Sequence, residues 1–138
     1  MRTCIVDTGI LYALFDAGDS WHERAVKFAN QFPGKLVVPQ TVIPEAAYLI
    51  NKYLGPAAEQ HLISALVTEE FTLEALNSKD LRRIAVLLRD YADLTIGTVE
   101  ASVIALAERL KTHEIATTDR RHFSVIKLAH AKPMVLLP

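Results

Sequence analysis

The chain has 138 residues, of which 51% are hydrophobic and 22% are charged, and its formal net charge at pH 7 is −1. This length and composition exclude a disordered chain, favour one globular domain over residues 1–138, and do not by themselves require a polyanionic partner. The single cysteine, Cys4, excludes a disulfide framework, and no apolar run approaches the roughly 18 residues of a membrane span, so we expect a cytoplasmic protein without membrane contact.

Along the first half of the chain, short apolar strands alternate with segments whose apolar residues recur at helical spacing. In chain order we expect a strand at Thr3–Val6, a helix at Thr8–Phe15, a helix from Asp19-Ser20 to Gly34, a strand at Lys35–Val38, a helix from Thr41 to about Leu54 and a helix from Gly55-Pro56 to about Val67. Ser20 is the expected N-cap of the second helix because Glu23, three residues later, would complete a capping box. Thr41 is the expected N-cap of the helix that carries Glu45.

The second half of the chain continues the alternation. We expect a strand at Phe71–Glu74, a helix capped by Ser78, a helix at Val99–Leu110 capped by Thr98, a strand at Glu114–Thr118 and a strand at Met134–Leu137. Because helices separate the strands, the sequence predicts a three-layer α/β/α fold around a mainly parallel sheet of about five strands. In such a sheet, ligand-binding and catalytic residues lie at the edge formed by the carboxyl ends of the strands.

Four carboxylates that lie far apart in the chain are expected at that edge. Asp7 and Asp119 follow predicted strands, whereas Glu45 and Glu100 lie in the first turns of predicted helices. Acids that converge in this way would form an all-oxygen pocket, and a hard divalent cation relieves their repulsion most simply. The sequence therefore predicts a metal-dependent active site.

Each acid also has a structural explanation. Asp7 could cap the helix that follows it, Glu45 and Glu100 could stabilise helix dipoles, and Asp119 could be an ordinary turn residue. All four would then share one edge by accident, so their joint placement favours the metal site. The five histidines show no metal-ligand spacing and are expected to be scattered surface residues. They are His22, His61, His113, His122 and His130.

Four segments together resemble the PIN domain family, and most closely the VapC-type toxins of bacterial toxin–antitoxin pairs. They are IVDTGILYAL, TVIPEAAYLI, YADLTIGTVEASVIALAERL and IATTDRRHF, and they span essentially the whole chain in the expected order. The resemblance implies a ribonuclease that depends on Mg²⁺ or Mn²⁺ and acts on RNA. It also implies a protein that is commonly homodimeric and is paired with a small antitoxin whose tail blocks the site.

The resemblance assigns roles to individual residues. Asp7, Glu45, Glu100 and Asp119 match the four family acids in order, and the expected metal ligands among them are Asp7, Glu100 and Asp119. The expected supporting residues are Thr8, Asp93 and Thr118, of which Thr118 would orient a carboxylate by hydrogen bonding. Arg120 and Arg121 are candidates for RNA phosphate contact, although a solvated surface explains such basic pairs equally well.

Glu100 departs from the family pattern, which usually has Asp at this position. The additional methylene moves the carboxylate by roughly 1.5 Å, so the site either adapts, favouring Mn²⁺, or loses activity. A catalytically silent PIN-like module that binds RNA or protein therefore stays an alternative, as does a housekeeping PIN ribonuclease. An aspartyl-phosphate phosphatase is disfavoured because its pattern has a second Asp two residues after the first, and Gly9 occupies that position here. A phospho-receiver is disfavoured because it would need a neighbouring acidic pair and a lysine after a late strand, and neither is evident in the sequence.

Overall fold

The computed structural model describes residues 1–130 and 132–138, and a sheet of five strands lies at its centre. The strands are β1 Thr3–Val6, β2 Lys35–Pro39, β3 Thr72–Glu74, β4 Glu114–Ala116 and β5 Val135–Leu137. They are all parallel and lie in the order β3-β2-β1-β4-β5. The predicted parallel sheet of about five strands is therefore confirmed.

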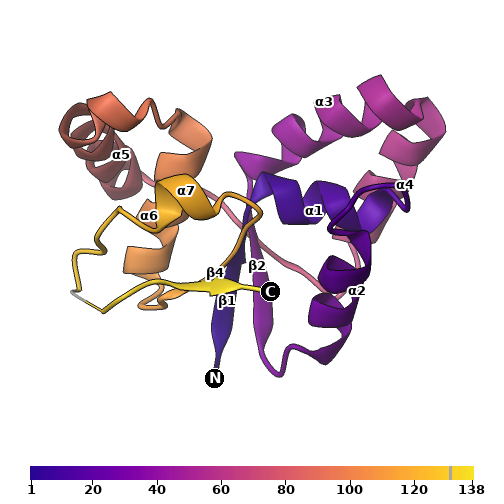
Figure 1. The fold of residues 1–138 in the computed structure, drawn as a ribbon, viewed down its shortest axis with the longest axis horizontal. Coiled ribbons are helices and arrows are strands. Elements are labelled where there is room, and N and C mark those ends of the chain that lie inside the picture. The colour runs from indigo at the N-terminus through magenta and orange to yellow at the C-terminus, as the bar shows by residue number, and fades with distance from the viewer. Residues whose placement is uncertain (131) are drawn as a thin grey trace.

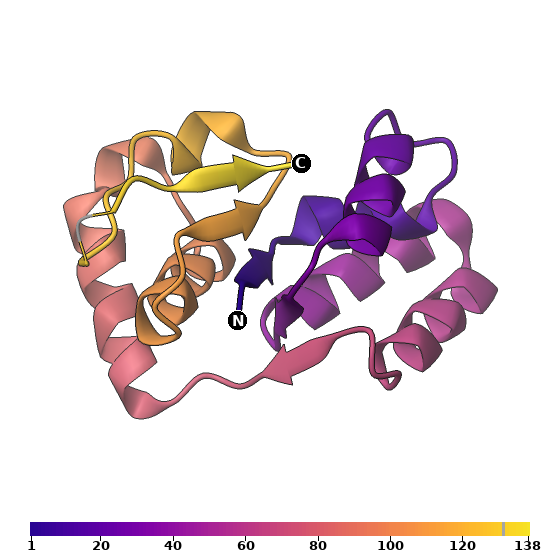
Figure 2. The ribbon, with the colours of Figure 1, turned by 90° about the horizontal axis from the view of Figure 1, so that it is seen from below.

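Helices cover both faces of this sheet (Figure 1). They are α1 Thr8–Phe15, α2 His22–Gln31, α3 Val42–Leu54, α4 Pro56–Leu66, α5 Ser78–Asp90, α6 Thr98–Arg109 and α7 Arg120–Phe123, with a 3-10 turn, η1, at Ala92–Leu94. The connections from β1 to β2 and from β2 to β3 step across the sheet in one direction, so right-handed crossovers place α1–α4 on one face. The connection from β3 to β4 steps back, and α5 and α6 consequently lie on the other face, as Figure 2 shows.

The core is centred on β1 and α6. Cys4, Ile5 and Val6 of β1 are at most 1% exposed, because β2 and β4 flank this strand and helices cover both of its faces. The segment 101–107 of α6 is buried on all sides, since this helix lies between the sheet and α5. Burial raises the pKa of the Cys4 thiol to about 12, so this cysteine behaves as a small apolar core residue. Among the described residues, no helix is both long and apolar enough to cross a membrane.

Several predicted helix starts are wrong by one or two residues. Helix α2 begins at His22 rather than after Ser20, because the Asp19 carboxylate accepts a hydrogen bond from the Trp21 main-chain N–H at 2.8 Å and forms a turn before the helix. The capping box predicted for Ser20 and Glu23 is therefore absent. This helix ends at Gln31, three residues before Gly34. Gly34 is required for another reason, since a Cβ atom there would lie 2.2 Å from the carbonyl oxygen of Arg2.

The caps of α5 and α6 each lie one residue before the predicted position. Asn77, not Ser78, caps α5: its side chain accepts from the Asp80 N–H at 2.8 Å, and the Asp80 carboxylate accepts from the Asn77 N–H at 3.0 Å. Gly97, not Thr98, occupies the N-cap position of α6. At the start of α5, Asn77 and Ser78 are neighbouring polar side chains that compete for the same cap, and the sequence does not show which of them makes the bond.

Candidate active site

The carboxyl ends of β1 and β4 bring two of the predicted acids to the same edge of the sheet. Asp7 directly follows β1, and its N–H donates to the carbonyl of Ala116, the last residue of β4, at 2.9 Å. Asp119 lies three residues beyond Ala116. Because β1 and β4 are neighbours in the sheet, both acids lie at the same part of this edge.

Asp7 is held in place from two directions and is only 7% exposed. One carboxylate oxygen accepts from the Thr8 N–H at 2.8 Å, and the other accepts from the Thr117 hydroxyl at 2.9 Å. Burial raises the pKa of Asp7 to about 6; the two hydrogen bonds oppose this rise, while the negative charges of Glu100 and Glu45 add to it. The influence of Glu100 and Glu45 on this pKa indicates that the first three acids share one electrostatic environment.

Thr117 is the functional residue that the sequence analysis missed. Its hydroxyl donates to the Asp7 carboxylate and accepts from the Asp119 N–H at 2.9 Å, so this buried side chain links the first and fourth acids. This orienting role was predicted for Thr118, whose hydroxyl instead packs against Gly9, where a Cβ atom would lie 2.3 Å from it. The register identifies the correct threonine: Val6 pairs with Ala116, so the next residues along the two strands are Asp7 and Thr117.

Glu45 and Glu100 occupy the helix positions expected for them. Glu45 lies in the first turn of α3 and its side chain is exposed. Glu100 lies in the first turn of α6, where one carboxylate oxygen accepts from the Gly97 N–H at 3.0 Å. Glu100 therefore makes a capping contact with its own helix, besides the position in the first turn that would stabilise a helix dipole. Asp93 lies in the 3-10 turn with an exposed side chain, and its supporting role stays a prediction.

Asp119 caps the short helix α7 and contacts a histidine. One of its oxygens accepts from the His122 N–H at 3.0 Å, and the other lies 2.8 Å from the imidazole Nδ1 of the same residue. His122 is thus a partner of a predicted site residue rather than an isolated surface histidine. Arg120 donates to the carbonyls of Leu136 and Pro138 at 2.7 and 2.6 Å and so fixes the end of β5, whereas Arg121 is exposed.

The donor atoms of this edge suit a hard divalent cation. The acids supply carboxylate oxygens, burial disfavours the negative charge of Asp7, and the Thr8 hydroxyl is buried with no hydrogen-bond partner among the described residues. Over the same residues, no three acidic, histidine or cysteine side chains are close enough to hold one ion together. In this arrangement the described acids therefore do not form a three-ligand cation site.

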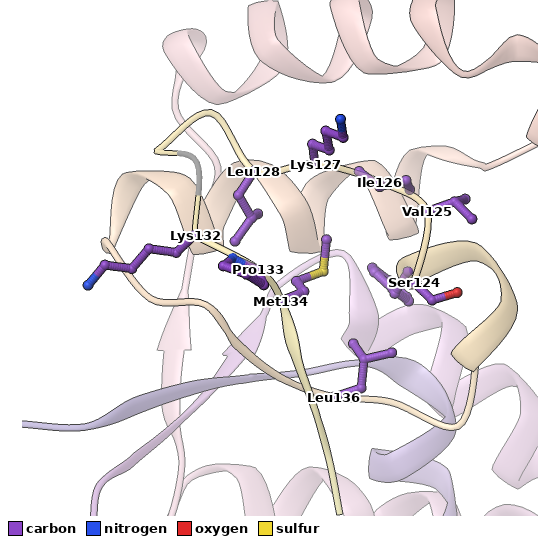
Figure 3. A pocket seen from close by; sticks show the side chains of 10 residues that line it. Ser124, Val125, Ile126, Lys127, Leu128, Lys132, Pro133, Met134 and Leu136 are labelled. Atoms are coloured by element: carbon purple, nitrogen blue, oxygen red, sulfur yellow. The ribbon is translucent and has the colours of Figure 1, made fainter.

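A cavity of about 630 Å³ lies elsewhere, beside the segment that connects α7 to β5 (Figure 3). Its lining is mainly apolar and comes from residues between Phe123 and Leu136, so none of the four acids borders it. Figure 3 shows the Lys127 and Lys132 side chains directed away from its centre. The size of a cavity therefore does not identify the acidic edge, which is recognised by its chemistry.

Comparison with known proteins shows the same family that the four sequence segments indicated. Residues 4–128 match the model of the PIN domain family. Ribonuclease VapC26 of Mycobacterium tuberculosis is 32% identical over 123 residues, which cover 89% of this chain and 91% of that protein.

Solved structures show the same fold at lower sequence identity. The Mycobacterium tuberculosis toxin VapC20, described as cleaving the sarcin–ricin loop, superimposes with a TM-score of 0.84 at 18% identity, over 99% of this chain and all of that one. A toxin–antitoxin complex from Klebsiella pneumoniae gives a TM-score of 0.70 at 22% identity, over 89% of this chain and 92% of that one.

Proposed function

This chain belongs to the PIN domain family, and we propose that it is a metal-dependent endoribonuclease, the toxin of a VapBC-type toxin–antitoxin pair. The observation that carries the proposal is the placement of Asp7, buried at the carboxyl end of the central strand and within the electrostatic influence of Glu45 and Glu100. Ribonuclease VapC26, which is similar over nearly its whole length, supports RNA as the substrate.

The proposed divalent ion is Mg²⁺ or Mn²⁺, and the residues that would hold it are Asp7, Glu100 and Asp119. When bound, such an ion neutralises charge on a phosphodiester and supplies a hydroxide near neutral pH, so no protein nucleophile is required. The all-oxygen donor set and the buried Thr8 hydroxyl, which has no hydrogen-bond partner in the described part of the chain, support this choice over a softer metal. Because Glu100 is longer than Asp, tolerance of the larger Mn²⁺ is expected.

The chain's own groups divide the remaining tasks. Thr117 fixes the direction of the Asp7 carboxylate through a hydrogen bond at 2.9 Å. Glu45 is exposed in the first turn of α3, and we assign its carboxylate as the acceptor of the proton that the attacking water loses. The main-chain N–H groups of Thr8 and His122 hold one oxygen each of Asp7 and Asp119, so these two acids keep their orientation without substrate.

Partners follow from the same proposal. The Klebsiella pneumoniae structure of similar fold is a toxin–antitoxin complex, which supports a cognate antitoxin for this protein. We propose that the tail of this antitoxin blocks the acidic edge. A homodimer and a cytoplasmic location belong to the proposal as well. A silent PIN-like module is the second candidate, and the observation that favours it is the engagement of Glu100 in the cap of its own helix.

The test is cleavage of a pool of structured RNAs by the purified protein with Mg²⁺, with Mn²⁺ and with a chelator. We expect cleavage with either ion, none with the chelator, and a loss of at least about 100-fold in Asp7→Asn, the scale on which directly acting groups contribute. Absence of cleavage by the folded protein with either ion would favour the silent module. Cleavage by Asp7→Asn at the wild-type rate would remove Asp7 from the site.

A further inference from the structure

The carboxylates of Asp119 and Asp7 have similar sets of hydrogen-bond partners, although the two residues follow different strands. Asp7 places one carboxylate oxygen on the N–H of Thr8, in the helix that follows, and the other on the hydroxyl of Thr117. Asp119 likewise places one oxygen on a main-chain N–H of the helix that follows and the other on a side chain, and His122 provides both contacts at 3.0 and 2.8 Å. His122 thus corresponds in geometry to Thr117.

The hydrogen-bond roles in the second pair follow from chemistry. An ionised carboxylate only accepts hydrogen bonds, so Nδ1 of His122 must carry the proton that it shares with Asp119. The bond from the main-chain N–H of His122 to Asp119 is sufficient to cap α7. The contact between the imidazole and Asp119 is therefore not required for capping and calls for another explanation. A carboxylate has about four lone-pair sites, and two of those on Asp119 stay available when His122 occupies the other two.

The backbone on both sides of this pair is fixed. The Asp119 N–H donates to Thr117 at 2.9 Å, and Phe123, the residue after His122, is fully buried. Arg120 donates to carbonyls of the last strand and the C-terminal residue. Figure 1 shows α7 beside the carboxyl end of β4. His122 therefore presents its ring from an anchored position, as a residue that orients another side chain must.

We propose that His122 is a positioning residue of the metal site, which holds the Asp119 carboxylate so that its unused lone pairs face the divalent ion. This inference rests on the proposed function. Ligating carboxylates are commonly oriented by a hydrogen bond from a neighbouring side chain, and loss of such a bond lowers metal affinity. His122 itself neither binds the ion nor touches the RNA in this role.

Three substitutions separate this role from a structural one. In His122→Asn the amide nitrogen can take the place of Nδ1, in His122→Gln the donor is displaced by one methylene, and in His122→Ala it is missing. Each variant keeps the main-chain N–H that caps α7, so all three should unfold within a few degrees of wild type in chelator. His61→Ala is the matched control, because His61 is exposed on α4 and belongs to a different part of the chain.

The measurement is the affinity for Mn²⁺ by titration calorimetry, with RNA cleavage in Mn²⁺ recorded alongside. We expect about 10-fold weaker binding or more in His122→Ala and His122→Gln, and a change below about threefold in His122→Asn, which restores the donor. His61→Ala should bind like wild type.

Two results would overturn the proposal. In the first, the wild-type protein cleaves RNA, but His122→Ala binds Mn²⁺ as tightly as wild type or more tightly. This would show that His122 does not position Asp119 for the ion, or that it holds this acid away from the ion. The proposed nuclease would then stand without the inference. A wild-type protein that neither binds Mn²⁺ nor cuts RNA would remove the proposed function and the inference together.

Discussion

Asp7, after β1, and Asp119, after β4, are positioned at the carboxyl edge of the sheet in different ways. Asp7 follows β1 without an intervening residue, is buried, and is linked through Thr117 to the neighbouring strand. Asp119 comes after a short turn, its side chain is 30% exposed, and its partner His122 belongs to the helix that it caps.

Sheet register therefore fixes the first acid, whereas a local turn fixes the fourth. Asp7 is oriented by a neighbouring strand at the cost of burying its charge. Asp119 keeps part of its solvation, but both of its oxygens contact its own short helix, whereas Asp7 shares only one oxygen with α1.

The largest effect on the free energy of unfolding is expected for Asp7→Asn, in the buried region of the site. The Asp7 pKa is raised from its ordinary value of 3.8 to about 6, so the folded protein binds more protons than the unfolded chain between these pH values. Its free energy of unfolding should therefore fall as the pH rises from about 4 to about 6, by up to about 3 kcal/mol. A neutral Asn recovers part of this loss, and its amide can donate to the Thr117 hydroxyl.

Urea unfolding in chelator at pH 4 and pH 7 measures the effect of Asp7→Asn. We expect the variant to be about 1–3 kcal/mol more stable than wild type at pH 7, with little difference at the lower pH, where both carboxyl and amide are neutral. An Asn variant that is less stable than wild type at pH 7 would show that the charge of Asp7 is already compensated within the protein.

Thr117→Val tests the link between the two regions. It removes the hydrogen bond to Asp7 and leaves the Asp119 N–H without its acceptor, so we expect a loss of about 2 kcal/mol in the free energy of unfolding. Thr118→Val is the matched control, with a similar change in shape and no bond to an acid. Equal losses in the two variants, measured by urea unfolding, would return the orienting role to Thr118.

Glu100→Asp tests whether the acid at the start of α6 serves the site or only its helix. An Asp at this position can still cap, because Asp80 does so at the corresponding position of α5. We therefore expect Glu100→Asp to retain or increase cleavage in Mg²⁺ and Glu100→Gln, which keeps the cap without the charge, to lose about 10-fold. Wild-type cleavage by Glu100→Gln would identify Glu100 as a structural residue.

The smallest expected effect concerns the helix starts themselves. Asn77→Ala should lower the free energy of unfolding by about 1 kcal/mol because it removes the cap of α5, whereas Ser20→Ala should change it by less than about 0.5 kcal/mol. Thermal unfolding of the two variants beside wild type measures both effects. A larger loss for Ser20→Ala would restore the capping role that the sequence predicted for Ser20.

The positions of the acids could be predicted from the sequence because they depend on patterns that extend over whole elements. Buried strands and amphipathic helices are recognised by their spacing, and a parallel sheet brings the residues after its strands to one edge. Asp7 and Asp119 are therefore placed by topology. Glu45 and Glu100 are placed by the helices that begin near the same edge.

The contacts of these acids could not be predicted, because they depend on single atoms. Thr117 and Thr118 are chemically identical neighbours, and only the pairing of Val6 with Ala116 decides which hydroxyl meets Asp7. The contact of His122 with Asp119 was not predicted, because the histidines were considered only as metal ligands. A histidine that contacts an acid three residues earlier does not have the spacing expected of metal ligands. Ser20 failed as a cap since Asp19 made the competing turn.

Diffraction from crystals grown with Mn²⁺, recorded at an energy where manganese scatters anomalously, tests most directly whether acids from strand ends and helix starts serve one ion. We expect one anomalous peak at the carboxyl edge, bound by oxygens of Asp7, Glu100 and Asp119, with the Asp119 carboxylate still in contact with His122. Crystals of a protein that cuts RNA in Mn²⁺ but shows no peak beside Asp7 would contradict the proposed site.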